Sequence, residues 1–118
     1  MTKIAITVFS DINTVEALGK VSNAFMLANE AIENGDQLKI IFDGAGTKWI
    51  GELEKEDNKL HGLYKGIKGN ITGVCSYCAQ AFGVKNEIVK AGLPLLEEYK
   101  GHPSIRNLVA DGFHVLVF

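Results

Sequence analysis

The sequence lacks the features that mark a membrane protein, a nucleic-acid-binding protein or a chain of several domains. No apolar stretch reaches about 18 residues, so a membrane-spanning helix is not expected. Lysine and arginine are scattered and the formal net charge is −2, which gives no electrostatic reason to bind nucleic acid or an anionic membrane. There is no internal repeat, linker or low-complexity tract, so we expect a single domain over residues 1–118.

Cysteine is also scarce, and the two cysteines that are present lie close together at Cys75 and Cys78. The first predicted strand begins at Lys3, which leaves no room for a signal peptide, so we expect a cytoplasmic protein. In a reducing compartment, two close cysteines are more often catalytic, redox-active or metal-binding than a structural disulfide. The apolar share of 47% and the charged share of 22% are ordinary for a globular protein.

Apolar runs rich in β-branched residues alternate with segments of helical periodicity along the chain. The apolar runs predict strands over residues 3–9, 37–42, 70–74, 93–96 and 113–118. The segments between them predict helices, and this alternation is typical of a parallel sheet with right-handed crossovers and helices on both faces. We therefore predict an α/β fold with three αβα layers and a five-stranded, mostly parallel sheet.

The longest predicted helix follows the first strand. Asn13 is the expected N-cap, with Glu16 in the capping-box position, and Gly35 is the expected stop. Residues at intervals of three or four predict its buried face, namely Val15, Leu18, Val21, Phe25, Ala28 and Ile32.

Shorter helices are predicted on either side of the cysteines. Thr47 is the expected cap of a helix that carries Trp49, Ile50 and Leu53. Pro103 is expected in the first turn of a helix that ends at Ala110, with Ile105, Leu108 and Val109 facing inward. The glycines at 44 and 46 fit a tight turn better than a phosphate-binding loop, because two glycines after a strand are a weak signal.

The stretch 73–83 contains both cysteines and is the centre of the functional hypothesis. Cys75 follows a predicted strand and precedes a predicted helix. Backbone N–H groups at a helix start stabilise an anion, so we expect Cys75 to have a lowered pKa and to act as a nucleophile. Cys78 lies roughly one helical turn further on and is expected to reach the same pocket.

The carboxyl ends of parallel strands meet at one edge of a sheet, and ligands bind beyond that edge where the strand order reverses. Several polar residues lie at such predicted ends and are expected to share one rim with Cys75. Backbone N–H groups near the start of the helix would hold the anion, and Tyr77 would shape access to the thiols. The predicted ligand-binding residues are Ser10, Asp43, Gly44, Ser76 and Tyr77.

Other interpretations of the cysteine pair remain open. Both could be buried structural thiols, since free cysteine is often buried. They could also bind zinc, but a second pair of ligands is missing unless histidines or another subunit supply it. His102 precedes Pro103 in a loop and fits a cap or surface position, although it could line the rim. We therefore predict no metal or organic cofactor.

A strand that ends at Cys75, followed by an alanine-rich helix that closes at Gly83-Val84, resembles the DsrE/DsrF-like family. Residues 92–96, 101–106 and 112–113 fit the second half of the same family. The resemblance implies a small flavodoxin-like α/β domain that assembles as a homotrimer or homohexamer. It also implies a sulfur carrier that holds a persulfide on a cysteine after the third strand and exchanges sulfur with rhodanese-type or TusA-type proteins.

The leading functional hypothesis is therefore a sulfurtransferase-like carrier acting through Cys75. Cys78 departs from the single-cysteine pattern of the family and is expected to act as a resolving thiol. Two other classes stay open: a Cys-x-x-Cys dithiol–disulfide redox protein, and a non-catalytic module that binds a small ligand or a protein. Apolar residues at Trp49, Ile50, Leu53, Leu60 and Leu63 are expected to supply surface for self-association.

Overall fold

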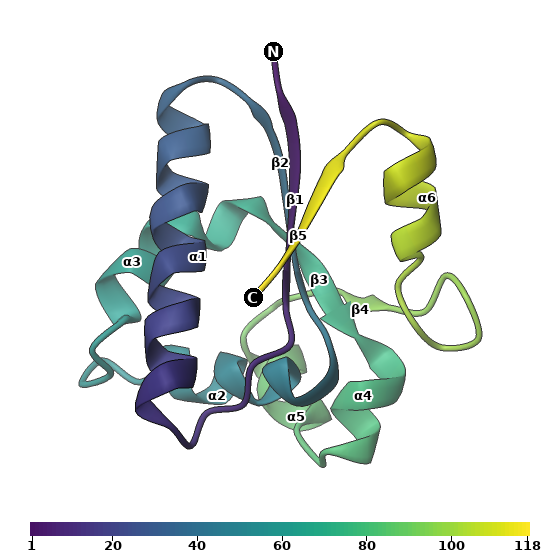
Figure 1. The fold of residues 1–118 in the computed structure, drawn as a ribbon. Coiled ribbons are helices and arrows are strands. Elements are labelled where there is room, and N and C mark those ends of the chain that lie inside the picture. The colour runs from purple at the N-terminus through teal and green to yellow at the C-terminus, as the bar shows by residue number, and fades with distance from the viewer.

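A computed structural model describes residues 1–118 and contains a five-stranded sheet in the order β4-β3-β2-β1-β5 (Figure 1). All neighbouring strands are parallel. The strands are β1 (Lys3–Val8), β2 (Gln37–Phe42), β3 (Ile71–Cys75), β4 (Leu95–Leu96) and β5 (His114–Val117). The predicted α/β fold with a five-stranded parallel sheet is therefore confirmed.

Helices cover the two faces of the sheet unequally. The helices are α1 (Val15–Glu33), α2 (Trp49–Leu53), α3 (His61–Ile67), α4 (Ser76–Ala81), α5 (Lys85–Lys90) and α6 (Ile105–Ala110), with 3₁₀ turns η1 (Gly44–Lys48) and η2 (Lys68–Asn70). Helices α1 to α5 all contribute to the main core, whereas α6 packs on the opposite face, where Leu108 meets Ala5 and Ile41. The second helix layer is thus α6 alone, opposite α1 in Figure 1.

The strand order explains which loops become neighbours. Each step from β1 through β2 and β3 to β4 moves in the same direction, and the chain then crosses to pair β5 with the other side of β1. The reversal of strand order is therefore at β1 and β5, where the N–H groups of Phe9 and Ser10 both donate to the carbonyl of Phe118. The cysteines follow β3 instead, so their neighbours are the loops after β2 and β4.

Helix α1 buries a different stripe from the predicted one. Its buried residues are Ala17, Val21, Ala24, Phe25, Ala28 and Ala31. Val15 is 87% exposed and Ile32 is also exposed, so these two positions of the predicted face are wrong. The alanines bring the helix backbone close to the sheet, and the stripe follows their spacing of four and three residues rather than the largest side chains.

Two of the predicted helix caps were wrong. Thr14 rather than Asn13 caps α1, because its hydroxyl accepts a hydrogen bond from the Ala17 N–H at 3.0 Å. Helix α2 has no side-chain cap, since the Thr47 hydroxyl donates to the Gly44 carbonyl within η1. Ser104 caps α6.

Two further expectations for α6 were wrong. Pro103 lies before the helix rather than in its first turn. Val109 is exposed, because only Leu108 and the partly buried Ile105 face the sheet.

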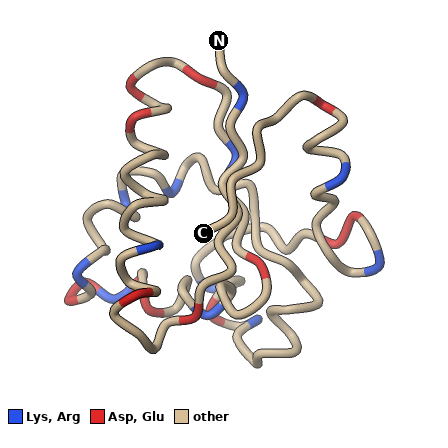
Figure 2. Tube along the Cα trace, in the orientation of Figure 1, with Lys and Arg blue, Asp and Glu red and all other residues tan.

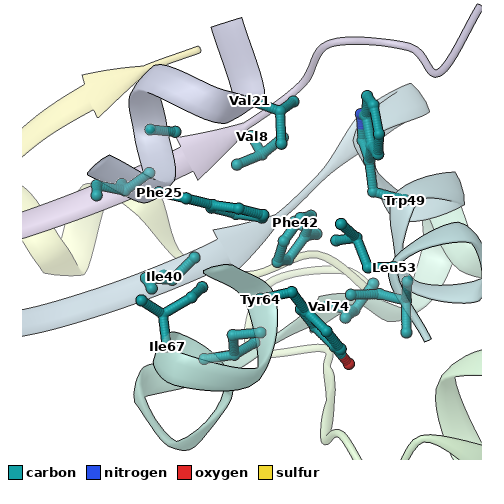
Figure 3. Close-up of a cluster of buried hydrophobic side chains, with 14 of the residues drawn as sticks. Val8, Val21, Phe25, Ile40, Phe42, Trp49, Leu53, Tyr64, Ile67 and Val74 are labelled. Carbon is teal, nitrogen blue, oxygen red and sulfur yellow. The ribbon is translucent and has the colours of Figure 1, made fainter. Parts of the chain in front are cut away.

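The main core lies between the sheet and the helices of the larger layer (Figure 3). Phe25 of α1 meets Phe42 of β2 edge-on, with ring centroids 6.3 Å apart. The residues Trp49, Ile50, Leu53 and Leu60, which were expected to supply an interface, are buried in this core. They pack inward because α2 and the loop after it close one end of the sheet, so they do not contribute to any surface for self-association.

Charged residues of both signs occur along most of the chain, whereas residues 69–84, which include β3 and α4, contain none (Figure 2). Ion pairs join residues such as Lys48 with Asp11 and Lys68 with Glu54. No helix of the structure combines the length and the apolar character that crossing a membrane requires.

Candidate functional site

Cys75 is the last residue of β3 and the N-cap of α4. Its Sγ accepts a hydrogen bond from the Cys78 N–H at 3.4 Å. The prediction that Cys75 lies where a strand ends and a helix begins is confirmed. The N–H group that reaches the sulfur belongs to Cys78, whereas the Tyr77 N–H donates to the Gly101 carbonyl instead.

Cys78 lies in the first turn of α4 and points to the loop after β2. Its thiol donates to Oδ1 of Asp43 at 3.4 Å. Asp43 also caps η1, since the same Oδ1 accepts the Gly44 N–H at 2.8 Å. Gly44 has a φ of 53°, a value that glycine adopts readily, and this turn orients the Asp43 carboxylate. The adjacency of β2 and β3 therefore joins Asp43 to the cysteine pair.

His102 comes from the loop after β4 and completes the cluster. Its Nδ1 lies 3.3 Å from Sγ of Cys75. The loop is held by a pair of 2.8 Å backbone hydrogen bonds between Tyr99 and His102. The Tyr77 ring packs against the imidazole at an interplanar angle of 34°, with centroids 4.7 Å apart, so Tyr77 flanks His102.

Side-chain ligand atoms of Asp43, Cys75, Cys78 and His102 all lie within 4.8 Å of one another. Asp43 and Cys75 are buried, while Cys78 and His102 are partly exposed. Both thiols are free and point to the same side of the start of α4. None of these four residues lines the surface hollow beside Trp49 or the one beside Arg106. The cluster is therefore a group of converging side chains outside those two hollows.

Burial raises the pKa of the Cys75 thiol to about 12, despite the hydrogen bond from the Cys78 N–H. The neighbouring Cys78 thiol and the Asp43 carboxylate add to this rise. The expected lowering of the pKa is therefore wrong for the isolated chain. A helix start lowers the pKa of a thiol only through its nearby backbone N–H groups. Here α4 has only six residues and the Cys75 side chain is fully buried, so the effect of burial is the larger one.

The structure brings together some of the predicted site residues and separates others. Asp43, Cys75 and Cys78 meet in the cluster, and Gly44 orients Asp43 through its N–H. Ser76 begins α4 beside them, but no hydrogen bond from its side chain reaches the cluster. Ser10 makes its contacts elsewhere, because its carbonyl accepts from the Trp49 indole N–H and its own N–H donates to Phe118.

His102 is the site residue for which the sequence analysis favoured a cap or surface position over a place on the rim. One signal pointed to it: His102 lies in the loop after the fourth strand, and strand ends in a parallel sheet share one edge. That signal needs β3 and β4 to be neighbours, and the sequence does not give the strand order.

The glycine pair after β2 has a packing role. A Cβ on Gly46 would lie 2.0 Å from the Val8 carbonyl oxygen, so η1 approaches β1 more closely than any side chain permits. The Gly44 N–H is already used by Asp43. These contacts support the tight turn that the sequence suggested.

No model of a known protein family matches the sequence. A solved structure, the conserved protein of unknown function BT1422 from Bacteroides thetaiotaomicron, is similar with a TM-score of 0.64 and 19% identity. The match covers 97% of this chain and 94% of that chain, and at this identity it shows the fold alone.

A relative from Methanocaldococcus jannaschii, the uncharacterized protein MJ0733, is 30% identical over 115 residues. These residues make up 97% of this chain and 93% of the relative. Because the similarity extends over nearly the full length of both proteins, the chain belongs to the same family as MJ0733.

Proposed function

We propose that the protein is a sulfur carrier that holds a persulfide on Cys75 and passes the sulfur to an acceptor thiol. The observation that carries this proposal is the convergence of two free thiols and one imidazole at the carboxyl edge of the sheet. A base within hydrogen-bond reach of a thiol is the usual arrangement for an activated sulfur nucleophile. No cofactor is required for this chemistry.

We assign the two cysteines different tasks, and their difference in burial supports this assignment. Cys78 is partly exposed, so its thiolate attacks the sulfane sulfur of a donor such as thiosulfate, and sulfite leaves with the bonding electron pair. Cys75 is buried beside it, with Nδ1 of His102 placed to accept its proton. The Cys75 thiolate then attacks the terminal sulfur of the Cys78 persulfide, and the Cys78 thiolate leaves. Return of sulfur to a partner follows the reverse path.

Intact mass spectrometry after incubation with thiosulfate or polysulfide, with and without a rhodanese, tests this proposal. The wild type is expected to gain and retain one sulfur atom per chain. Cys75→Ser is expected to lose that sulfur rapidly to added cyanide, because only the more exposed Cys78 can carry it. Cys78→Ser is expected to load more slowly. The proposal fails if the wild type gains no sulfur, or if the double serine variant gains as much.

A dithiol–disulfide redox protein is the second candidate, and the closeness of the two thiols favours it. Their sulfur atoms lie within 4.8 Å on the same side of the start of α4. Attack of Cys78 on the inner sulfur of a Cys75 persulfide would form the disulfide and release sulfide. A reduction potential near the thioredoxin value, on the order of −270 mV, would favour this function over storage of sulfur.

We further propose that the protein is a cytoplasmic, distant member of the DsrE/DsrF-like family, with rhodanese-type or TusA-type partners. The element order and the position of Cys75 support this assignment, and two free thiols suit a reducing compartment. A homotrimer or homohexamer would cover exposed apolar residues such as Met26, Val109 and Val117. Light scattering at micromolar concentration tests the assembly, and a monomer mass would contradict it.

A further inference from the structure

We propose that Asp43, Cys75, Cys78 and His102 form a binding site for one divalent transition-metal ion of the zinc type. Two thiolates, one imidazole and one carboxylate are all ligands that zinc accepts, and four protein ligands complete its preferred shell. The sequence analysis identified only the cysteine pair as possible zinc ligands, with histidines or another subunit needed to supply the rest. The fold supplies the second pair from the loops after β2 and β4.

The separations between the side chains fit this ion. Bonds of about 2.3 Å to sulfur and about 2.0–2.1 Å to nitrogen or oxygen place tetrahedral ligand atoms roughly 3.3–3.8 Å apart. The Cys75 sulfur lies 3.3 Å from Nδ1 of His102, and the Cys78 sulfur lies 3.4 Å from Oδ1 of Asp43. All four ligand atoms fall within 4.8 Å of one another. Small side-chain movements therefore suffice to enclose an ion.

The charge of Asp43 is an independent reason to place a cation here. Asp43 is only 7% exposed, and its carboxylate makes no ion pair with a lysine, an arginine or a histidine. Its Oδ1 receives only the Gly44 N–H and the Cys78 thiol. Buried charges in proteins are normally paired or coordinate metals, and a bound divalent ion would provide the missing positive charge.

Neighbouring groups already orient three of the four ligands. The Gly44 N–H holds Asp43, and the Cys78 N–H holds the Cys75 sulfur. The Tyr77 ring packs against His102, whose backbone is tied to Tyr99. Such outer contacts fix ligand orientation in metal sites and strengthen binding.

The chemistry of the ligands narrows the class of ion. Thiolate and imidazole ligands suit zinc, whereas calcium and magnesium need oxygen ligands and are disfavoured here. Binding requires both thiols to release their protons, so two protons leave for each ion bound. Four protein ligands also leave no open position, which is the pattern of a site that holds the ion rather than one that performs catalysis with it.

The proposed metal site does not depend on the proposed sulfur transfer. If both are correct, the bound ion would regulate the transfer. An ion bound to both sulfurs would occupy the electron pairs that attack a sulfane sulfur. The metal-bound protein is therefore expected to load no sulfur until a chelator removes the ion. Sulfur loading in the presence of a chelator tests the carrier function alone, so failure of one proposal is distinguishable from failure of the other.

The test is titration of the reduced full-length chain with Co²⁺, followed by displacement with Zn²⁺. A tetrahedral thiolate site is expected to give intense visible d–d bands and a near-ultraviolet sulfur-to-metal band that saturate at one ion per chain. The variants Asp43→Asn and His102→Gln are expected to lower the affinity by at least about tenfold, since even outer-shell changes cost about 10–100-fold. His114→Gln is the matched control, because His114 is exposed on β5 outside the cluster.

Loss of Cys75 could unfold the chain, since its side chain is part of the interior, so the decisive variants are those at Asp43 and His102. Thermal unfolding of each metal-free variant checks that it is folded before titration. The proposal is overturned if Co²⁺ gives no tetrahedral spectrum with the wild type. It is also overturned if Asp43→Asn and His102→Gln bind Co²⁺ as tightly as the His114→Gln control.

Discussion

Replacement of Gly46 by alanine tests the packing that places Asp43 beside the cysteines. The added Cβ would lie 2.0 Å from the Val8 carbonyl oxygen and 2.7 Å from the Val8 carbonyl carbon. Ordinary contacts are at least 3.4 Å, so the backbones of η1 and β1 must move apart by more than about 1 Å. Both segments are main chain, and neither can relieve the overlap by rotating a side chain.

The cost of this substitution has two parts. Overpacking of a close contact typically costs about 1–3 kcal/mol. The Val8 carbonyl also accepts the Asp43 N–H at 2.9 Å, and displacing it weakens a backbone hydrogen bond worth about 1 kcal/mol. We therefore expect Gly46→Ala to lower the free energy of unfolding by about 2–4 kcal/mol, a large part of the ~5–15 kcal/mol of a typical domain.

Gly19→Ala is the matched control for the same chemical change. Gly19 is exposed within α1, and a Cβ there meets nothing within 4 Å. Alanine in an exposed helix interior is expected to stabilise the protein by about 0.5–1 kcal/mol. The two substitutions should thus change stability in opposite directions.

Urea unfolding followed by Trp49 fluorescence measures both effects, because Trp49 is the only tryptophan and is 3% exposed. An unfolding midpoint for Gly46→Ala equal to that of the wild type would refute the close approach of η1 to β1. If Gly46→Ala remains folded, its Co²⁺ affinity is also expected to fall, since Asp43 begins the displaced turn.

Two further predictions concern the thiols and the buried tyrosine. Iodoacetamide is expected to modify Cys78 at least about tenfold faster than Cys75, because Cys75 is buried and its pKa is raised. Peptide mapping measures the two rates, and equal rates would contradict this prediction. Tyr64→Phe removes the hydroxyl that donates to the partly exposed Glu54 carboxylate and is expected to cost about 1 kcal/mol at neutral pH. Burial raises the pKa of Glu54, but hydrogen bonds from Tyr64 and Lys68 outweigh it, so the pKa lies below its usual 4.5. That stabilisation is complete above pH 4.5 and is lost as the pH falls through the lowered pKa, so urea unfolding should show the two proteins converging in acid. Burial raises the pKa of Tyr64 above its usual 10.0, so the wild type should also lose stability relative to Tyr64→Phe as the pH rises above about 10, where the unfolded chain ionises.

The strands could be predicted from the sequence because nearly all of their residues are apolar. Ile6 and Val8 face one helix layer and Ala5 faces the other, so both faces of β1 are buried. A continuous apolar run of this kind predicts a central parallel strand. The stripe on α1 was misplaced because Ala17 and Ala24 carry little hydrophobic signal, although their size is what lets the helix approach the sheet.

The site was only partly predictable, because strand order decides which loops lie beside the cysteines. Cys75 and Cys78 are close in sequence, and Asp43 ends a strand, so local reasoning found all three. His102 reaches Cys75 only because β4 pairs with β3, a contact that no periodicity encodes. The predicted direction of the Cys75 pKa shift was wrong because burial of the thiol, which depends on packing between distant segments, outweighs the local N–H groups of the helix start.

Asp43 distinguishes the two proposals for this cluster. A sulfur carrier needs the thiols and a base. Burial is the main cause that raises the pKa of Cys75, and the Asp43 carboxylate adds to it by opposing thiolate formation. A metal site uses that same negative charge, because the cation neutralises the carboxylate and both thiolates together. The carboxylate therefore hinders nucleophilic sulfur chemistry and favours binding of a cation. A protein with both properties would keep its thiols closed to sulfur donors while the ion is present and release them for sulfur chemistry when it leaves.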